Sequence, residues 1–204
     1  MSRVRVVRQL ILTFPFYFAA GAYAEFNACN EDYWVETLQK YEKSERSYNK
    51  AAENYNQTLS FHTQKPLIHQ KMAFDDLVYM WSPRYQAIHP SLNEQVNFAR
   101  AQSLIFEKVA LEAEKEKRDL ASLLSRWSII IEHCIEQRKL TNAQHGKNYK
   151  EQTRSLLSDI KQLQKKQLTL SKLYQQEMSL IERSRLTYDQ NKRRQKLSEH
   201  PASN

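Results

Sequence analysis

Glycine is almost absent from this sequence, which has two glycines in 204 residues. Loops that cradle phosphate groups or dinucleotides need several glycines, because the backbone must turn tightly and approach the ligand closely. Only Gly146 lies beyond the first 24 residues, so we exclude both kinds of site. Scarce glycine, together with abundant Gln, Lys, Glu, Leu and Ala, predicts long helices joined by few turns.

Histidines and nucleophiles also lack the groupings that metal binding or acyl transfer requires. No two of the six histidines have the i, i+4 spacing that places two metal ligands on one helix face. No serine or cysteine stands in a recognisable nucleophile motif. Glu132 and Glu136, which flank His133, fit an ordinary solvated helix face. We therefore expect no enzyme activity, no metal site and no cofactor.

The first 24 residues have the pattern of a signal peptide. Arg3, Arg5 and Arg8 precede an apolar stretch over residues 10–20, and small residues end the segment at Ala24. We expect cleavage after Ala24 and a periplasmic or secreted domain over residues 25–204. An uncleaved membrane anchor is the alternative, although the apolar stretch is shorter than the roughly 20 residues that a spanning helix needs.

The two cysteines, Cys29 and Cys134, lie in the part of the chain that would be exported. Disulfides persist outside the cytoplasm, so we expect an intramolecular bridge, with two free thiols as the alternative. In the chain-entropy model, a bridge that closes a loop of about a hundred residues stabilises a fold by roughly 4 to 5 kcal/mol.

Three stretches carry apolar or aromatic residues at alternating spacings of three and four, the pattern of helices with one buried face. They cover about residues 31–62, 92–139 and 142–197, and the third is less apolar than the second. Cys29 precedes the first stretch and Cys134 ends the second, so a bridge makes these two helices antiparallel. The prediction is an all-α, elongated antiparallel three-helix bundle or coiled coil, about 60 to 75 Å long.

Two short patterns indicate where the second and third helices begin. Ser91 is followed three residues later by Glu94, and Thr141 by Gln144, and both pairs have the form of a capping box. We therefore expect the turn between these helices near residues 140–146. A continuous helix through Gly146 is the alternative, because one glycine costs only about 1 kcal/mol in a helix interior.

A proline-bounded segment separates the first long helix from the second. Pro66, Pro83 and Pro90 break continuous helix, so we expect a short helix over about residues 67–81. Methionines and aromatic residues at helical spacing form adaptable binding surfaces, but the same residues could instead close the end of the bundle core. The candidate partner-binding residues are Met72, Phe74, Leu77, Met80, Trp81 and Tyr85.

Positive charge is concentrated in the last third of the chain. Residues 138–196 contain 15 basic and 5 acidic side chains, a net charge of +10, whereas residues 25–137 contain 13 and 17, a net charge of −4. The third helix could pair with the more acidic first two, or face an anionic surface such as lipid headgroups or an acidic protein. The candidate basic face comprises Lys161, Lys165, Lys166, Arg183, Arg185, Lys192, Arg193, Arg194 and Lys196.

Two stretches, residues 140–144 and 186–190, resemble the Leu-Thr-x-x-Gln motif of the small helical periplasmic chaperones of the Spy and CpxP type. The resemblance covers ten residues and implies a protein that shields unfolded clients. In that family the two motifs lie further apart and no disulfide spans the fold. Each stretch also has the form of a capping box.

These patterns favour binding over catalysis. We expect a non-enzymatic exported protein that serves as an interaction or scaffold component of the cell envelope or of a secretion apparatus, as a monomer or an oligomer. Nucleic acid is not an expected partner, because the chain has no recognised binding motif for it. A chaperone-like protein is one alternative, and a small enzyme or ligand carrier with a pocket near Trp127, Tyr41 and His133 is another.

Overall fold

The computed structural model describes residues 27–64 and 67–199, and these residues form helices and no strands. The all-α prediction is confirmed, whereas the predicted signal peptide lies outside the described residues. The three long helices are α1 (Glu31–Gln64), α3 (His89–Glu136) and α4 (Leu140–Glu199). Three short elements connect α1 to α3, namely η1 (Ile68–Gln70), α2 (Phe74–Tyr79) and η2 (Pro83–Ile88).

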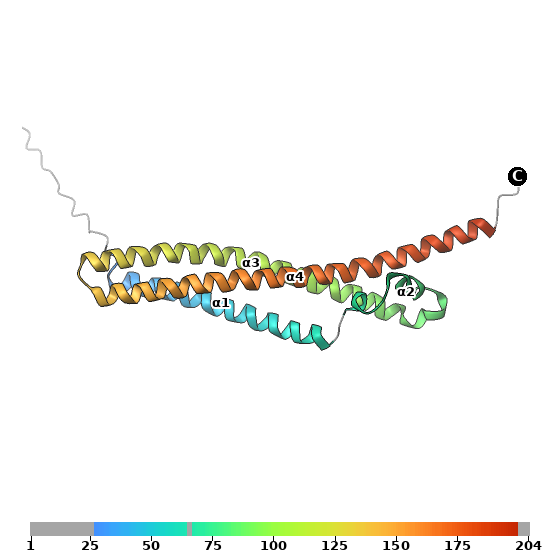
Figure 1. Ribbon diagram of the computed structural model, residues 1–204, viewed down its shortest axis with the longest axis horizontal. Coiled ribbons are helices and arrows are strands. Elements are labelled where there is room, and N and C mark those ends of the chain that lie inside the picture. The colour runs from blue at the N-terminus through green and yellow to red at the C-terminus, as the bar shows by residue number, and fades with distance from the viewer. Residues whose placement is uncertain (1–26, 65–66, 200–204) are drawn as a thin grey trace, which may run out of the picture.

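Helices α3 and α4 form the long axis of the molecule. They run antiparallel and pack closely, while α1 runs parallel to α4 (Figure 1). The 48 residues of α3 and the 60 of α4 correspond to about 72 and 90 Å at 1.5 Å per residue. The helix directions predicted from the cysteines are correct, and α4 is longer than the bundle expected from the sequence.

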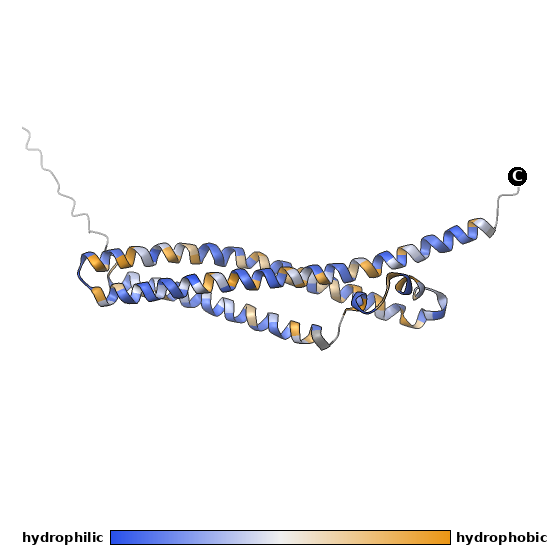
Figure 2. Cartoon of the chain, viewed as in Figure 1, coloured by the Kyte–Doolittle hydropathy of each residue, from blue (hydrophilic) through white to orange (hydrophobic). Residues whose placement is uncertain are grey.

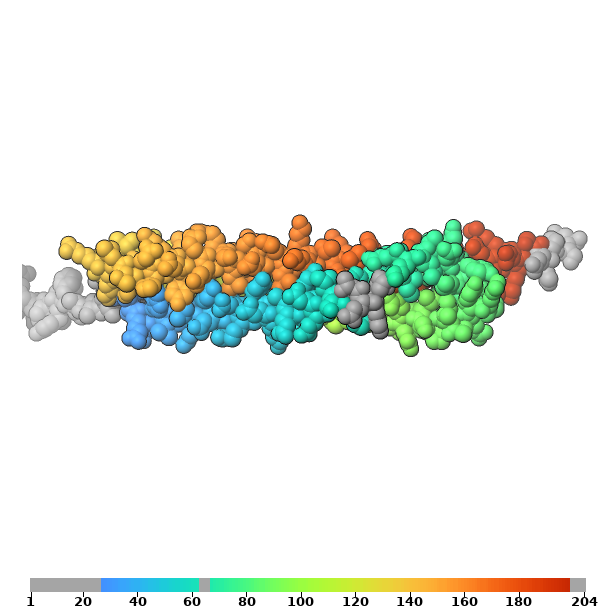
Figure 3. Space-filling view, turned by 60° about the horizontal axis from the view of Figure 1, so that its bottom comes forward, coloured from blue at the N-terminus to red at the C-terminus, as the bar shows by residue number. Residues whose placement is uncertain are grey.

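The third layer over this helix pair is made of two different segments. Helix α1 covers the half of α3 and α4 that lies next to their connecting turn, and residues 67–88 cover the other half (Figures 1 and 3). Leu67 packs with Phe106 and Tyr174, and Leu77 packs with Val96 and Ile181. The predicted three-helix bundle with a short proline-bounded helical insertion is therefore confirmed, with α1 as the third layer next to the connecting turn and residues 67–88 as the third layer beyond it.

The predicted bridge between Cys29 and Cys134 is confirmed, with their Cα atoms 5.0 Å apart. Aromatic rings fill the core beside it. Trp127 stacks on Tyr149 with ring centroids 5.1 Å apart, and Trp34 meets Trp127 edge-on at 5.4 Å. Such pairs are worth about 0.5 to 1.5 kcal/mol beyond the apolar area they bury. This end of the bundle is closed by both covalent and aromatic contacts.

The turn between α3 and α4 was predicted at the wrong place. Helix α3 ends at Glu136 and α4 begins at Leu140, so Thr141 and Gln144 lie inside α4 and form no capping box. Arg138 makes the turn with a φ of 58°, in the left-handed region. Gly146 is a buried residue of α4, and a Cβ built there would lie 3.0 Å from Cγ1 of Ile131. Its missing side chain allows the two helices to approach closely.

The single short helix predicted over residues 67–81 is also wrong, because η1 and α2 are separate elements. Ala73 adopts an extended conformation between them, with φ −67° and ψ 153°. Helix α3 begins at His89, two residues before the predicted Ser91, and Ile88 precedes it without a side-chain capping bond. Pro90 in the first turn supplies the helical φ that the start of α3 needs.

Candidate functional site

Of the predicted partner-binding residues, Leu77 and Trp81 are buried in the core between residues 67–88, α3 and α4. Met72, Phe74, Met80 and Tyr85 are partly buried. This placement is what the core-closing interpretation expects of Leu77 and Trp81. A binding role for the other four residues stays a prediction.

Trp81, which lies between α2 and η2, connects residues 67–88 to α4. Its indole Nε1 donates a hydrogen bond of 2.9 Å to Oγ of Ser184, and its ring lies 5.0 Å from that of His89. The guanidinium of Arg185 sits over the same ring at 5.3 Å. The Nε1 edge of Trp81 is therefore bonded to α4 in the core, while its ring packs beside His89 and under the guanidinium of Arg185.

Glu177 of α4 is the most heavily bonded buried side chain, and sequence reasoning did not single it out. Its carboxylate accepts the backbone N–H groups of Ile68 at 2.8 Å and His69 at 3.0 Å. It also accepts Nε2 of Gln95 at 2.9 Å and lies 2.6 Å from Nδ1 of His69. The carboxylate thereby ties η1 and α3 to α4.

Burial is the largest influence on Glu177 and by itself raises the pKa of the carboxyl group. The hydrogen bonds from His69, Ile68 and Gln95 act in the opposite direction and together outweigh it, so the pKa of Glu177 lies below its usual value. In the sequence, Glu177 is a charged residue at a position where the alternating spacing of three and four in the third helix expects an apolar one. Buried charges in proteins are paired or fully hydrogen-bonded, and Glu177 follows that rule.

The nine candidate basic residues are all exposed on α4. Within the described ranges, none of them forms an ion pair with α1 or α3. The ion pairs that do cross between helices are Arg100 with Glu182 and Arg126 with Glu36. Neither of these two pairs uses a cation of α4, and the nine basic residues themselves are exposed to solvent.

The last part of α4 extends past the rest of the molecule (Figure 1). Residues 189–198 are all exposed, and Figure 2 shows that these turns are mainly hydrophilic. Where α4 leaves the bundle, an open groove of about 330 Å³ lies between α4, η2 and the first turns of α3. Its lining residues are Trp81, Pro83, Gln86, His89, Asn93, Arg185, Tyr188, Asp189 and Lys192.

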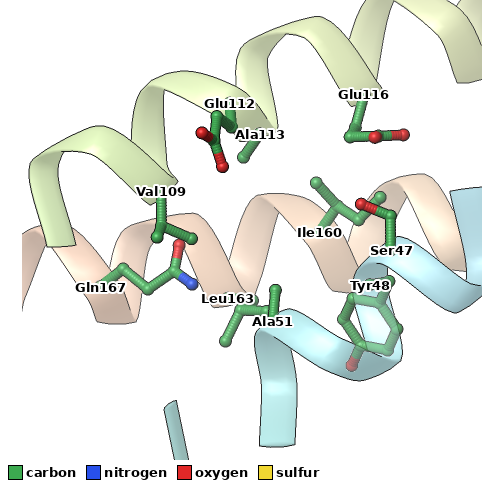
Figure 4. Close-up of a pocket in the computed structure, with 10 residues that line it drawn as sticks. All are labelled: Ser47, Tyr48, Ala51, Val109, Glu112, Ala113, Glu116, Ile160, Leu163 and Gln167. Carbon is green, nitrogen blue, oxygen red and sulfur yellow. The ribbon is translucent and has the colours of Figure 1, made fainter. Parts of the chain in front are cut away.

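The residues proposed to line an internal pocket are not gathered around a cavity. Trp127 and Tyr41 are buried in two different core clusters, and His133 accepts the backbone N–H of Ala28 at 3.3 Å. A cavity of about 60 Å³ does lie between α1, α3 and α4, with Tyr48, Glu112 and Gln167 among its lining residues (Figure 4). Small-molecule sites typically enclose roughly 300 to 1,000 Å³, so this cavity is too small for a typical small-molecule site.

The two stretches that resemble the chaperone motif both lie within α4, and the second is in its interior. Neither is a capping box, because Gln144 donates to Asn148 at 3.2 Å and Leu186 is preceded by more than forty helical residues. A chaperone-like function stays a prediction.

Comparison with protein-family models, with curated proteins and with solved structures finds no match for this chain. Over the described ranges, no helix has the length and hydropathy needed to cross a membrane. The same ranges contain no group of three or more His, Cys, Asp or Glu side chains placed to hold a metal ion.

Proposed function

We propose that this chain is a non-enzymatic exported protein that acts as an interaction or scaffold component of the cell envelope or of a secretion apparatus. In this proposal, the α3–α4 pair is a rigid rod and the basic end of α4 is the contact surface for an anionic partner. Export is supported by the signal-peptide pattern of residues 1–24 and by the Cys29–Cys134 bridge, which is a bond typical of oxidising compartments.

The observation that carries the proposal is the exposed end of α4. An isolated helix shorter than about 12 to 15 residues is marginal in water, so residues 189–198 gain little from helix formation alone. Over residues 183–196 the chain has six basic side chains and one acidic one, a net charge of +5. A helix end that is basic, exposed and poor in apolar residues is suited to electrostatic contact and poorly suited to closing a core.

Site-specific photo-crosslinking in the native host tests this proposal. A photoreactive amino acid replaces Leu197, which is 75% exposed on the end of α4, and in a matched variant it replaces Leu111, which is 72% exposed on α3. We expect a discrete adduct with an envelope protein from position 197 and none of that mass from position 111. The same adducts from both positions would refute a contact surface at the end of α4.

Intact mass spectrometry of the exported protein, under non-reducing conditions, tests the localisation. We expect a mature chain that begins at Glu25 and retains the Cys29–Cys134 bridge. Retention of Met1 together with free thiols would contradict export, and the search for a partner would then move to another compartment.

A further inference from the structure

The groove beside Trp81 and the basic end of α4 form one continuous surface. Arg185 and Lys192 line the groove and lie seven residues apart on α4, and Lys196 follows one turn later. Spacings of seven and four return to the same face of an α-helix, so these three cations form a row. The row is about 16 Å long at 1.5 Å per residue.

The other basic residues of the same segment point elsewhere. Arg193 and Arg194 follow Lys192 by one and two residues, which turns their Cβ directions by about 100° and 200° around the helix. Arg183 lies over the ring of Phe74 at 4.8 Å, on the side of α2. Thus Arg185, Lys192 and Lys196 share the groove face, whereas Arg193 and Arg194 do not.

Resting on the proposed function, we infer that the groove face binds an acidic helical segment of the partner protein, whose carboxylates meet Arg185, Lys192 and Lys196. Three observations support this occupant. The cations form no ion pair within the described part of the chain. Asp189 is the single acid on this face, and the stacking of Arg185 on Trp81 holds one guanidinium in place for bidentate contact with a carboxylate.

Shape favours a polypeptide over a lipid surface. The groove is walled on one side by α4 and on the other by η2 and the start of α3, and Arg185 and Lys192 line it, so a narrow segment that lies along the groove can contact both. A flat layer of headgroups would meet Arg193 and Arg194 equally well, because they lie on the outer faces of the same exposed turns. A partner helix with acids at positions i, i+7 and i+11 presents its own row of charges with matching spacing.

A synthetic helical peptide with glutamates at positions i, i+7 and i+11 in an alanine and glutamine background is the probe. The control peptide has the same composition, with the glutamates moved to different faces. Binding is measured with the full mature protein at low and high salt. We expect the spaced peptide to bind about ten times more tightly than the control, which corresponds to roughly 1.4 kcal/mol, and both to weaken with salt.

Two double variants remove the same charge from the same exposed turns. K192Q/K196Q removes two cations from the groove face, and R193Q/R194Q removes two from the other faces. We expect the first to weaken the spaced peptide about tenfold and the second by less than about threefold, because only the first removes direct partners. Equal effects of the two variants, or binding to phosphatidylglycerol vesicles with no binding of either peptide, would overturn the inference.

A spectroscopic readout places the contact. The chain has three tryptophans, and Trp34 and Trp127 lie together in the cluster beside the disulfide. In a two-dimensional spectrum of the indole N–H groups, we expect the peptide to shift the signal of Trp81 and to leave the other two in place. Binding in the groove would be contradicted if all three indole signals shifted, or if the Trp81 signal did not shift.

The double variants also separate this inference from the proposed function. If the adduct from position 197 survives K192Q/K196Q but is lost in R193Q/R194Q, the end of α4 binds a partner through another face, and only the groove inference fails. If no adduct forms in the wild-type chain, the proposed function itself fails.

Discussion

The half of the molecule next to the disulfide and the half covered by residues 67–88 use the same two long helices but close their cores by different means. In the disulfide half, one continuous helix, α1, meets α3 and α4 through aromatic rings and a covalent bridge. In the other half, which we call the Glu177 half, three short elements form the cover, and η1 and Trp81 donate hydrogen bonds to the buried polar side chains Glu177 and Ser184 of α4.

The difference follows from what each covering segment contributes. A long helix satisfies its own backbone N–H groups beyond its first turn, so α1 can be held mainly by apolar contacts. Each short helical element leaves N–H donors free at its start and C=O acceptors free at its end, and burying such a group without a partner costs about 1 to 3 kcal/mol. Glu177 supplies acceptors for the N–H groups of Ile68 and His69 at the start of η1. The irregular cover therefore requires a polar residue in the core of α4.

Of the substitutions that test this comparison, removal of the disulfide should lower the free energy of unfolding most. The bridge closes a loop between positions 105 residues apart, so C29S/C134S should lower the free energy of unfolding by about 4 to 5 kcal/mol. Urea denaturation measures the total loss, and hydrogen exchange should show the greatest loss of protection in α1. A uniform loss of protection in both halves would mean that the halves are not closed independently.

The substitution E177Q should have the next largest effect and should act on the other half. A neutral amide cannot accept all the hydrogen bonds that the carboxylate accepts, so we expect a loss of about 2 to 4 kcal/mol. Hydrogen exchange should show the loss in residues 67–88. E182Q is the control, because Glu182 is partly exposed in its pair with Arg100, where an ion pair is worth less than about 1 kcal/mol.

The effect of E177Q should also depend on pH. The pKa of Glu177 is lowered in the folded protein from the usual 4.5. A carboxyl group of this kind contributes stability above its unfolded pKa, and this contribution disappears as the pH falls through the folded pKa. The gap in unfolding free energy between wild type and E177Q should therefore close as the pH falls below about 4.5. A gap that persists in strong acid would contradict this assignment.

The hydrogen bonds of two buried tryptophans allow a direct comparison of the two halves, with smaller expected losses of stability. Trp127 donates to Thr153 at 3.1 Å in the disulfide half, and Trp81 donates to Ser184 at 2.9 Å in the Glu177 half. T153V and S184A each leave a buried indole N–H without its acceptor, so each should cost about 1 to 2 kcal/mol. Hydrogen exchange should locate the S184A effect in residues 67–88 and the T153V effect around the disulfide. If either variant opened both halves equally, the comparison would fail.

The helices, their directions and the bridge could be predicted, because each depends on a local period or on the presence of two cysteines. The cover of the Glu177 half could not be predicted, because the backbone donors to Glu177 lie 108 and 109 residues away in sequence. The sequence did show polar residues at positions of the third helix where the spacing of three and four expects apolar ones. Of these, Thr153 and Ser184 accept indole N–H groups and Glu177 accepts backbone N–H groups.

The candidate site was predictable in part for a similar reason. Helical periodicity alone places Arg185, Lys192 and Lys196 on one face of a helix. It does not indicate that η2 and the start of α3 end beside that face and form a groove with Trp81. Such a juxtaposition depends on where each element stops, and element ends are set by tertiary contacts as much as by local sequence.

The turn between α3 and α4 gives the smallest predicted effect, and it concerns the disulfide half alone. The only glycine near the turn, Gly146, serves close helix packing, so the left-handed position falls to Arg138. A non-glycine residue in that conformation costs about 1 to 2 kcal/mol. Glycine avoids this cost, but its greater conformational freedom in the unfolded chain offsets roughly half of the gain in stability. R138G should therefore raise the free energy of unfolding by about 0.5 kcal/mol. Gln137 has a φ of −82°, so Q137G gains no such relief and should destabilise the protein. Hydrogen exchange of residues 67–88 should change in neither variant, because the turn belongs to the opposite end of the rod.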